Sequence, residues 1–123
     1  MRPPWKAIGM GLSLWWCQVD VAWAGCAHAF DLEAWMAQRA GAWWRRLAPL
    51  AGAEPPGGIE ICRIPAGRPH ARGGRIVLPP LREEEARLSV AHEYVHLVFR
   101  HHPRTRDERF VEQMARELIL GEQ

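Results

Sequence analysis

The sequence lacks the features that mark several common classes of protein. No apolar run approaches the roughly 20 residues of a membrane span, because Gln18 and Asp20 interrupt the longest candidate, residues 7–25. The formal net charge is only +2, and the basic residues form no uninterrupted block. Internal repeats and low-complexity tracts are also missing. We therefore expect no transmembrane span and no nucleic-acid partner.

Cysteine is scarce as well. Cys17, Cys26 and Cys62 are too few and wrongly spaced for a cysteine-based zinc knuckle. Two of them could form one disulfide if the protein is exported, but the spacing does not select the pair.

The N-terminal segment has some character of an export signal. Arg2 and Lys6 precede an apolar stretch, and "AWAGC" at 22–26 weakly resembles a lipoprotein cleavage site. The polar Gln18, the charged Asp20 and three tryptophans are unfavourable in such a signal. We therefore expect this segment to belong to the fold.

The length of 123 residues predicts one domain, 1–123, with a single modest core. Apolar residues at helical spacing predict a core-packing helix over about 31–48, with Asp31 as its N-cap and Pro49 as its end. The tryptophans of this stripe are expected to be core side chains.

Two short strands should follow this helix. "IEICRI" at 59–64 alternates apolar and polar residues, and "RIVL" at 75–78 is stopped by two prolines. We expect them to pair as a hairpin or as neighbours, with 65–74 as a loop. "RIVL" is also a candidate edge strand for an extended substrate, with an ordinary sheet strand as the alternative.

Two more helices complete the predicted order. The acidic cluster 83–85 suits a helix N-terminus, and this helix should run from about Arg82 to Arg100 or His101. Thr105 and Glu108 have capping-box spacing at the start of a last helix that Gly121 ends. The expected fold class is α+β: a short sheet or hairpin packed on three helices.

The motif His92-Glu93-Tyr94-Val95-His96 lies on the second of these helices. Histidines four residues apart project from one face, so both imidazoles can bind one zinc ion. Glu93 is placed to take a proton from a water activated there, as a general base. The only tyrosine, Tyr94, is turned away and should pack in the core.

The motif needs a third ligand, and three residues are candidates. His102 follows His96 by six residues, but Phe99 occupies the place where that pattern needs a turn-permitting glycine. Glu108 and Glu112 are four residues apart on the next helix. One could bind the metal while the other orients a histidine, and we favour Glu108 as the ligand.

These residues resemble the gluzincin metallopeptidases, in which a glutamate on a second helix completes the zinc site. "DERFV" at 107–111 is similar to the "NEGFA" type of segment that carries this ligand. The resemblance implies a zincin-like fold, Glu108 as ligand and Glu112 as the acid behind it. The eleven residues between His96 and Glu108 are fewer than in larger members.

A second resemblance covers more of the chain. Segments such as "GCAHAFDLEAW", "AWWRRLA" and "LSVAHEYVHLVFRHHPRTRDERFVEQMAREL" are similar to the C-terminal region of a family of predicted secreted bacterial proteins. Its members are longer and tend to be encoded near α2-macroglobulin-like proteins. The resemblance implies a periplasmic or secreted location and a zincin-like site, with either a missing N-terminal region or an α2-macroglobulin-like protein as a partner.

The sequence therefore predicts a zinc-dependent hydrolase, with a peptide or protein as its substrate. One alternative is a metal-binding or interaction module without turnover in an α2-macroglobulin-associated system. Another is a metal hydrolase that acts on a different amide or ester. His28, His70, Arg72 and His101 are all candidate donors to a developing oxyanion, and no spacing selects one.

Overall fold

The computed structural model of the chain describes residues 25–52 and 54–121. The expectations for Cys17 and for the signal-like N-terminal segment fall outside these residues. The described elements are β1 (Ala27–His28), α2 (Phe30–Ala51), β2 (Glu60–Arg63), β3 (His70–Arg72), β4 (Arg75–Leu78), α3 (Glu83–Val98), the 3₁₀ helix η1 (Pro103–Arg106) and α4 (Glu108–Leu120). The expected α+β class is confirmed.

The four strands form one sheet in the order β1-β2-β4-β3. β2 and β4 pair in parallel, with Ile61 opposite Ile76, so the expected pairing of these two strands is confirmed. β4 lies inside the sheet, so "RIVL" is not an edge strand, and the alternative of an ordinary sheet strand is confirmed. The edge strands are β1 and β3, and β3 lies within the segment predicted to be a loop.

β3 and β4 form a tight hairpin. Gly73 and Gly74 connect them with φ angles of 58° and 79°. Two consecutive positive φ angles are typical of a type I′ turn, whose twist matches that of the paired strands. The glycines therefore allow Arg72 to lie opposite Arg75 and bring β3 back along β4.

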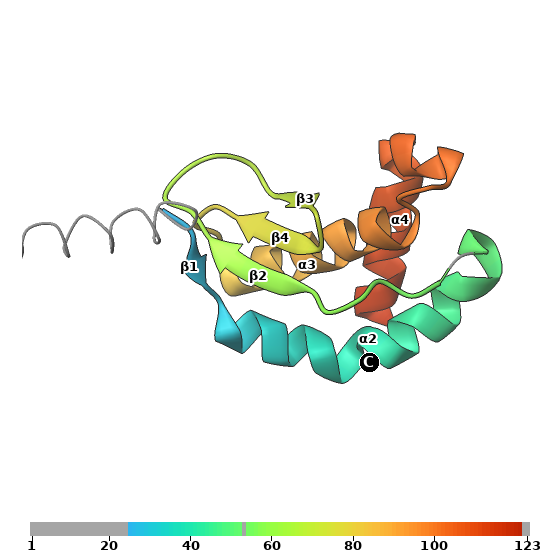
Figure 1. Cartoon of the computed structure of the whole chain (residues 1–123), viewed down its shortest axis with the longest axis horizontal. Helices are drawn as coiled ribbons and strands as arrows, with labels where there is room; N and C mark the ends of the chain where they lie inside the picture. The colour runs from blue at the N-terminus through green and yellow to red at the C-terminus, as the bar shows by residue number, and fades with distance from the viewer. Residues whose placement is uncertain (1–24, 53, 122–123) are drawn as a thin grey trace, which may run out of the picture.

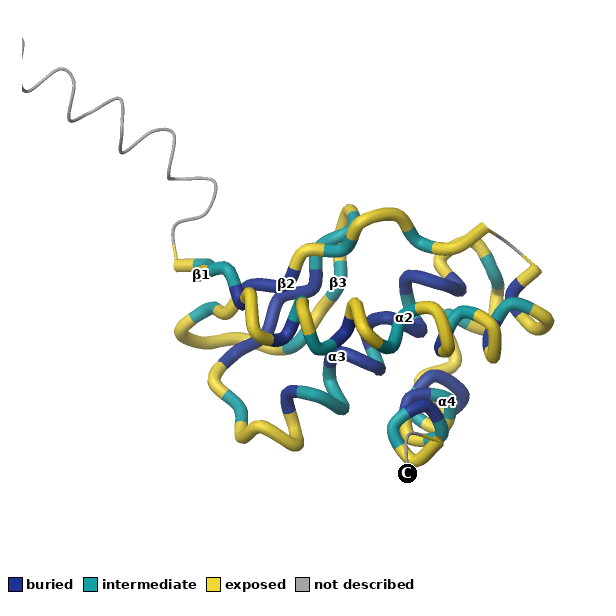
Figure 2. The backbone as a smooth tube through the Cα atoms, turned by 90° about the horizontal axis from the view of Figure 1, so that it is seen from below, coloured by how far each residue is buried: buried dark blue, intermediate teal, exposed yellow. Residues whose placement is uncertain are grey.

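The helices pack against the sheet and against each other (Figure 1). α3 contacts β3 and β4, α2 contacts β2 and α3, and α4 packs along α3. α2 and α4 carry buried and exposed residues at helical spacing, whereas α3 has no exposed residue from Ala86 to Val98 (Figure 2). Trp43 is buried, and Trp35 and Trp44 pack against the core, as predicted.

α2 differs from its predicted bounds at both ends. Its N-cap is Ala29, and the expected cap Asp31 lies in the first turn, where its carboxylate accepts hydrogen bonds from Arg63 at 3.0 and 3.1 Å. Pro49 does not end the helix, which continues to Ala51 and stops at Gly52 in a left-handed conformation. Pro49 lies in the last turn and is exposed, so water can bond the carbonyl that it leaves unpaired.

The two later helices start and end close to their predicted positions. α3 begins at the acidic cluster as expected and ends at Val98, two or three residues early. The predicted capping box of α4 is wrong, because Asp107 caps the helix and accepts hydrogen bonds from the backbone of Arg109 and Phe110. Thr105 lies instead in η1, the turn that joins α3 to α4.

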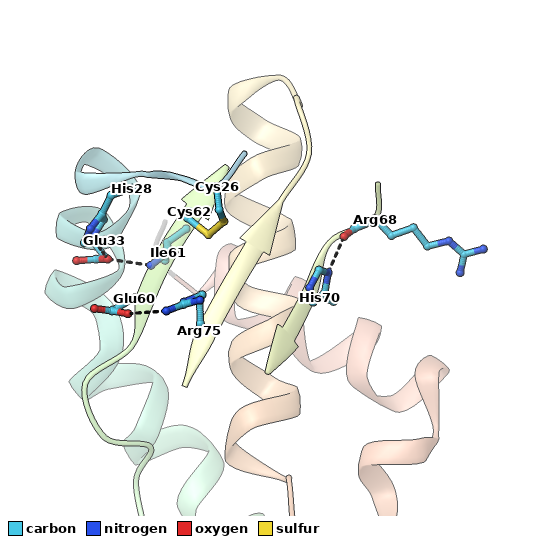
Figure 3. The surroundings of a disulfide bond; sticks show 9 residues. All are labelled: Cys26, His28, Glu33, Glu60, Ile61, Cys62, Arg68, His70 and Arg75. Atoms are coloured by element: carbon cyan, nitrogen blue, oxygen red, sulfur yellow. Dashed lines mark hydrogen bonds and ion pairs between the residues drawn. A yellow bond between two sulfur atoms is a disulfide. The ribbon is translucent and has the colours of Figure 1, made fainter. Parts of the chain in front are cut away.

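A disulfide between Cys26 and Cys62 fastens the start of the described chain to β2 (Figure 3). Nearby, Glu33 pairs with His28 and accepts a hydrogen bond from the backbone of Ile61 at 2.8 Å. These contacts hold the first turn of α2 against the sheet. No helix in the described residues is long and apolar enough to cross a membrane.

Candidate metal centre

His92 and His96 project from one face of α3 toward α4. Their ring centroids are 5.1 Å apart, and both side chains are about one-fifth exposed, at 20% and 22%. The helical spacing alone explains this geometry, because residues four apart lie one above the other on a helix. The predicted pairing of the two imidazoles is therefore present.

Glu108, the first residue of α4, meets both histidines. Its Oε1 atom lies 3.1 Å from Nε2 of His92, and its Oε2 atom lies 3.0 Å from Nε2 of His96. One potential ligand atom from each of the three residues lies within 4.8 Å of the others. Two imidazole nitrogens and a carboxylate form a donor set that suits a divalent ion such as zinc.

The other nitrogen of each imidazole is held by a different residue. Nδ1 of His92 lies 2.9 Å from Oε1 of Glu112, and Nδ1 of His96 lies 3.0 Å from Oγ1 of Thr105. Such contacts fix the orientation and tautomer of a metal-binding histidine. They leave both Nε2 atoms directed toward Glu108.

Glu112, which the gluzincin resemblance would place behind a metal ligand, contacts His92 from α4. It is itself held by Arg116, whose guanidinium lies 2.8 Å from its second carboxylate oxygen. The contact of Thr105 was not predicted, because its spacing to Glu108 favoured a helix cap. No local signal in the sequence shows that the η1 turn brings it under His96.

Glu93 is the only charged side chain that is buried among the described residues, with 6% of its surface exposed. Burial raises the pKa of this carboxyl above its usual value, and the neighbouring His92 and His96 act in the opposite direction. Glu93 nevertheless borders an open cleft together with both histidines. A buried acid at the wall of a cleft is well placed for proton transfer.

The third candidate ligand, His102, lies outside the group formed by the two histidines and Glu108. Its ring packs edge-on against Phe99, and its Nδ1 accepts a hydrogen bond from the backbone of Arg104 at 3.1 Å.

Tyr94 is buried against Trp43, and burial raises its pKa to about 12. Its predicted packing role is confirmed.

A cleft of about 1020 Å³ runs between α3 and the β3 edge of the sheet. It is lined by His92, Glu93, His96 and Glu108 and by the segment from Arg68 to Gly74. Of the four candidate oxyanion donors, His70 and Arg72 therefore line the cleft. His101 borders a different hollow, and His28 stacks on Phe30 beside the disulfide.

Residues 15–104 match a protein family described as "Predicted secreted protein (DUF2300)". The chain belongs to this family. The match includes His92, Glu93 and His96 and ends before Thr105, Glu108 and Glu112. The DUF2300 description confirms the expected secreted location, and a disulfide is typical of such compartments.

The chain is also similar to a protein of Escherichia coli. The chain is 30% identical over 90 residues, or 72% of its length, to "Uncharacterized protein YfaQ" of Escherichia coli (strain K12). The aligned region spans 16% of YfaQ, so this chain corresponds to a small part of that relative. No solved structure matches the chain.

Proposed function

We propose that this DUF2300 protein is a zinc-dependent hydrolase of the gluzincin type, with a peptide or protein as its substrate. In this proposal His92, His96 and Glu108 bind the zinc ion, and Glu93 is the general base. The observation that carries it is the convergence of two Nε2 atoms and one carboxylate beside a buried glutamate in an open cleft.

A bound zinc ion would supply Lewis acidity to a water molecule and to the substrate carbonyl. Glu93 would take the proton of the attacking water and then give it to the leaving amine nitrogen. Its burial supports this role, because a raised pKa brings a carboxyl closer to the proton affinity that such transfer needs. Glu112 and Thr105 would keep both imidazoles oriented throughout.

The β3 edge would align an extended peptide along the cleft. Ala71 lies opposite Ile76, one position from the pair that closes the two-residue turn. Hydrogen-bonded and non-hydrogen-bonded pairs alternate in an antiparallel hairpin, so the N–H and C=O of Ala71 point away from β4. Among the described residues, no strand covers that side. A substrate strand added there would run past the histidines with its backbone hydrogen-bonded.

The proposal is tested by comparing wild type with Glu93→Gln and His96→Ala. We expect wild type to purify with about one zinc ion per chain and to cleave members of a quenched-fluorescent peptide library. Glu93→Gln should keep the zinc and lose about 10²- to 10⁴-fold in rate, the usual contribution of a general base. His96→Ala should lose both.

Mass-spectrometric metal analysis and initial rates provide the two measurements. His101→Ala is the matched control, because this exposed histidine lies outside the cleft and should change neither quantity. Negligible zinc in all proteins would refute the metal site. Zinc without turnover in wild type would favour the interaction module of an α2-macroglobulin-associated system, and cleavage of other amides or esters alone would favour a different hydrolase.

A further inference from the structure

The cleft beside the metal centre has an uneven distribution of charge. Its two carboxylates, Glu93 and Glu108, both belong to the metal centre. Apart from His92 and His96, the remaining titratable groups that line it are Arg68, His70, Arg72 and Arg100, all of which carry or can carry positive charge. The wall away from the metal centre is therefore basic.

The arginines of this wall are not neutralised by acids in the described part of the chain. Arg68 and Arg72 are exposed and have no ion-pair partner there, and Arg100 donates to the backbone carbonyl of Leu97 at 2.7 Å. Elsewhere on the surface, arginines such as Arg63 and Arg87 do pair with carboxylates, at 3.0 and 2.8 Å. The arginines of the wall can thus form ion pairs with a negatively charged group of a ligand.

Two of these basic side chains belong to the sheet edge. His70 and Arg72 are alternate residues of β3 and therefore lie on the same face of the strand, opposite to that of Ala71. Figure 3 shows His70 on β3, facing the carbonyl oxygen of Arg68. The Nδ1 atom of His70 lies 3.0 Å from that oxygen. If a strand were added antiparallel to β3, the Cβ atoms of directly opposite residues on that face would lie about 4.5–5.5 Å apart.

We propose that the cleft selects extended peptides that carry a carboxylate beside β3, paired with Arg72 and Arg68. An acidic side chain or a free C-terminal carboxylate can supply this group. The inference rests on the proposed function in taking a peptide as the ligand, but it concerns binding and can be measured without turnover.

Binding is best measured with the zinc-loaded Glu93→Gln protein, which should hold a peptide without cutting it. The probes are four fluorescein-labelled alanine–valine octapeptides. They carry a central glutamate or glutamine, and each is made with a free or an amidated C-terminus. Fluorescence anisotropy gives the Kd of each peptide.

We expect the glutamate peptides to bind at least fivefold more tightly than the glutamine peptides when the C-terminus is amidated. If the peptides with a free C-terminus bind more tightly than their amidated counterparts and glutamate gives no advantage over glutamine, the terminal carboxylate is the ligand. Arg72→Gln and Arg68→Gln should each remove most of the preference and leave the neutral, amidated peptide unaffected. Higher salt should reduce the preference, because it screens exposed charges.

Arg45→Gln is the matched control, since this exposed arginine lies on α2 outside the cleft. Circular dichroism melts check that all variants fold. Equal affinity for the four peptides, or no saturable binding of any of them, overturns the inference. Cleavage of peptides without charge preference would leave the proposed function standing, whereas charge-dependent binding without cleavage would leave only the inference standing.

Discussion

At the scale of single residues, the candidate centre depends on contacts behind the ligands as much as on the ligands. Each histidine is held at Nδ1 by a residue from beyond α3: Glu112 for His92 and Thr105 for His96. Partners in these positions raise the basicity of a ligating imidazole and restrict its rotation. Their loss should therefore weaken metal binding without removing a ligand.

We expect Glu112→Ala and Thr105→Ala to weaken zinc binding about 10- to 100-fold, the usual effect of such residues. Glu108→Ala should weaken it more, because in our proposal it removes a ligand. Competition with a chromogenic zinc chelator measures the three affinities. Gln113→Ala, an exposed change on α4, is the control, and a larger loss for Glu112→Ala than for Glu108→Ala would exchange their roles.

Much of this centre can be read from the sequence, because helix periodicity fixes which residues share a face. That periodicity placed His92 beside His96 and offered Glu108 and Glu112 together on a second helix. It cannot give the angle between the two helices, which depends on the η1 turn and on packing. The contact of Thr105 follows from that turn and was accordingly missed.

At the scale of elements, the hairpin turn before β4 determines where the β3 edge lies. Gly73 has a positive φ of 58°, and a Cβ there would meet no atom within 4 Å, so a side chain would cost only backbone strain. We expect Gly73→Ala to lower the free energy of unfolding by about 1–2 kcal/mol. Urea denaturation measures the change.

Gly57→Ala is the matched control for this prediction. A Cβ at Gly57 also meets no atom within 4 Å, and its φ lies outside the positive range. This change should cost nothing measurable. An equal loss in both variants would show that the turn conformation at Gly73 does not account for the effect.

The same hairpin explains where the sequence failed to predict the sheet. β3 has three residues, two of them basic or titratable, and stands between turn-forming residues, so it has no alternating apolar pattern. Its strand conformation is imposed by pairing with β4 and by the two glycines. Because the sequence does not predict β3, it leaves "RIVL" as a candidate edge strand, and the inner position of β4 in the sheet is missed.

At the scale of the whole molecule, the Cys26–Cys62 disulfide closes a long segment of chain. The two cysteines are separated by 36 positions, and Cys62 is fully buried. Closing a loop of that length in the unfolded chain should stabilise the protein by about 4 kcal/mol. Neither the pairing nor this contribution follows from cysteine spacing, because chain proximity in space depends on the fold.

We expect the double variant Cys26→Ala, Cys62→Ala to unfold at a markedly lower urea concentration than wild type. Reduction of wild type with dithiothreitol should shift its midpoint in the same direction and should not shift that of the variant. Thiol labelling confirms the redox state in each sample. A wild-type midpoint that does not respond to complete reduction would contradict the prediction.

The positions of the disulfide and the candidate centre bear on how the protein would withstand proteolysis. The disulfide anchors the strand that begins the described fold, and the contacts of Glu108 and Glu112 anchor its last helix to α3. With zinc bound, neither element could detach while its covalent or coordinate link remained intact. Fraying of these ends, the usual first step of digestion, would then require a reductant at one end and a chelator at the other.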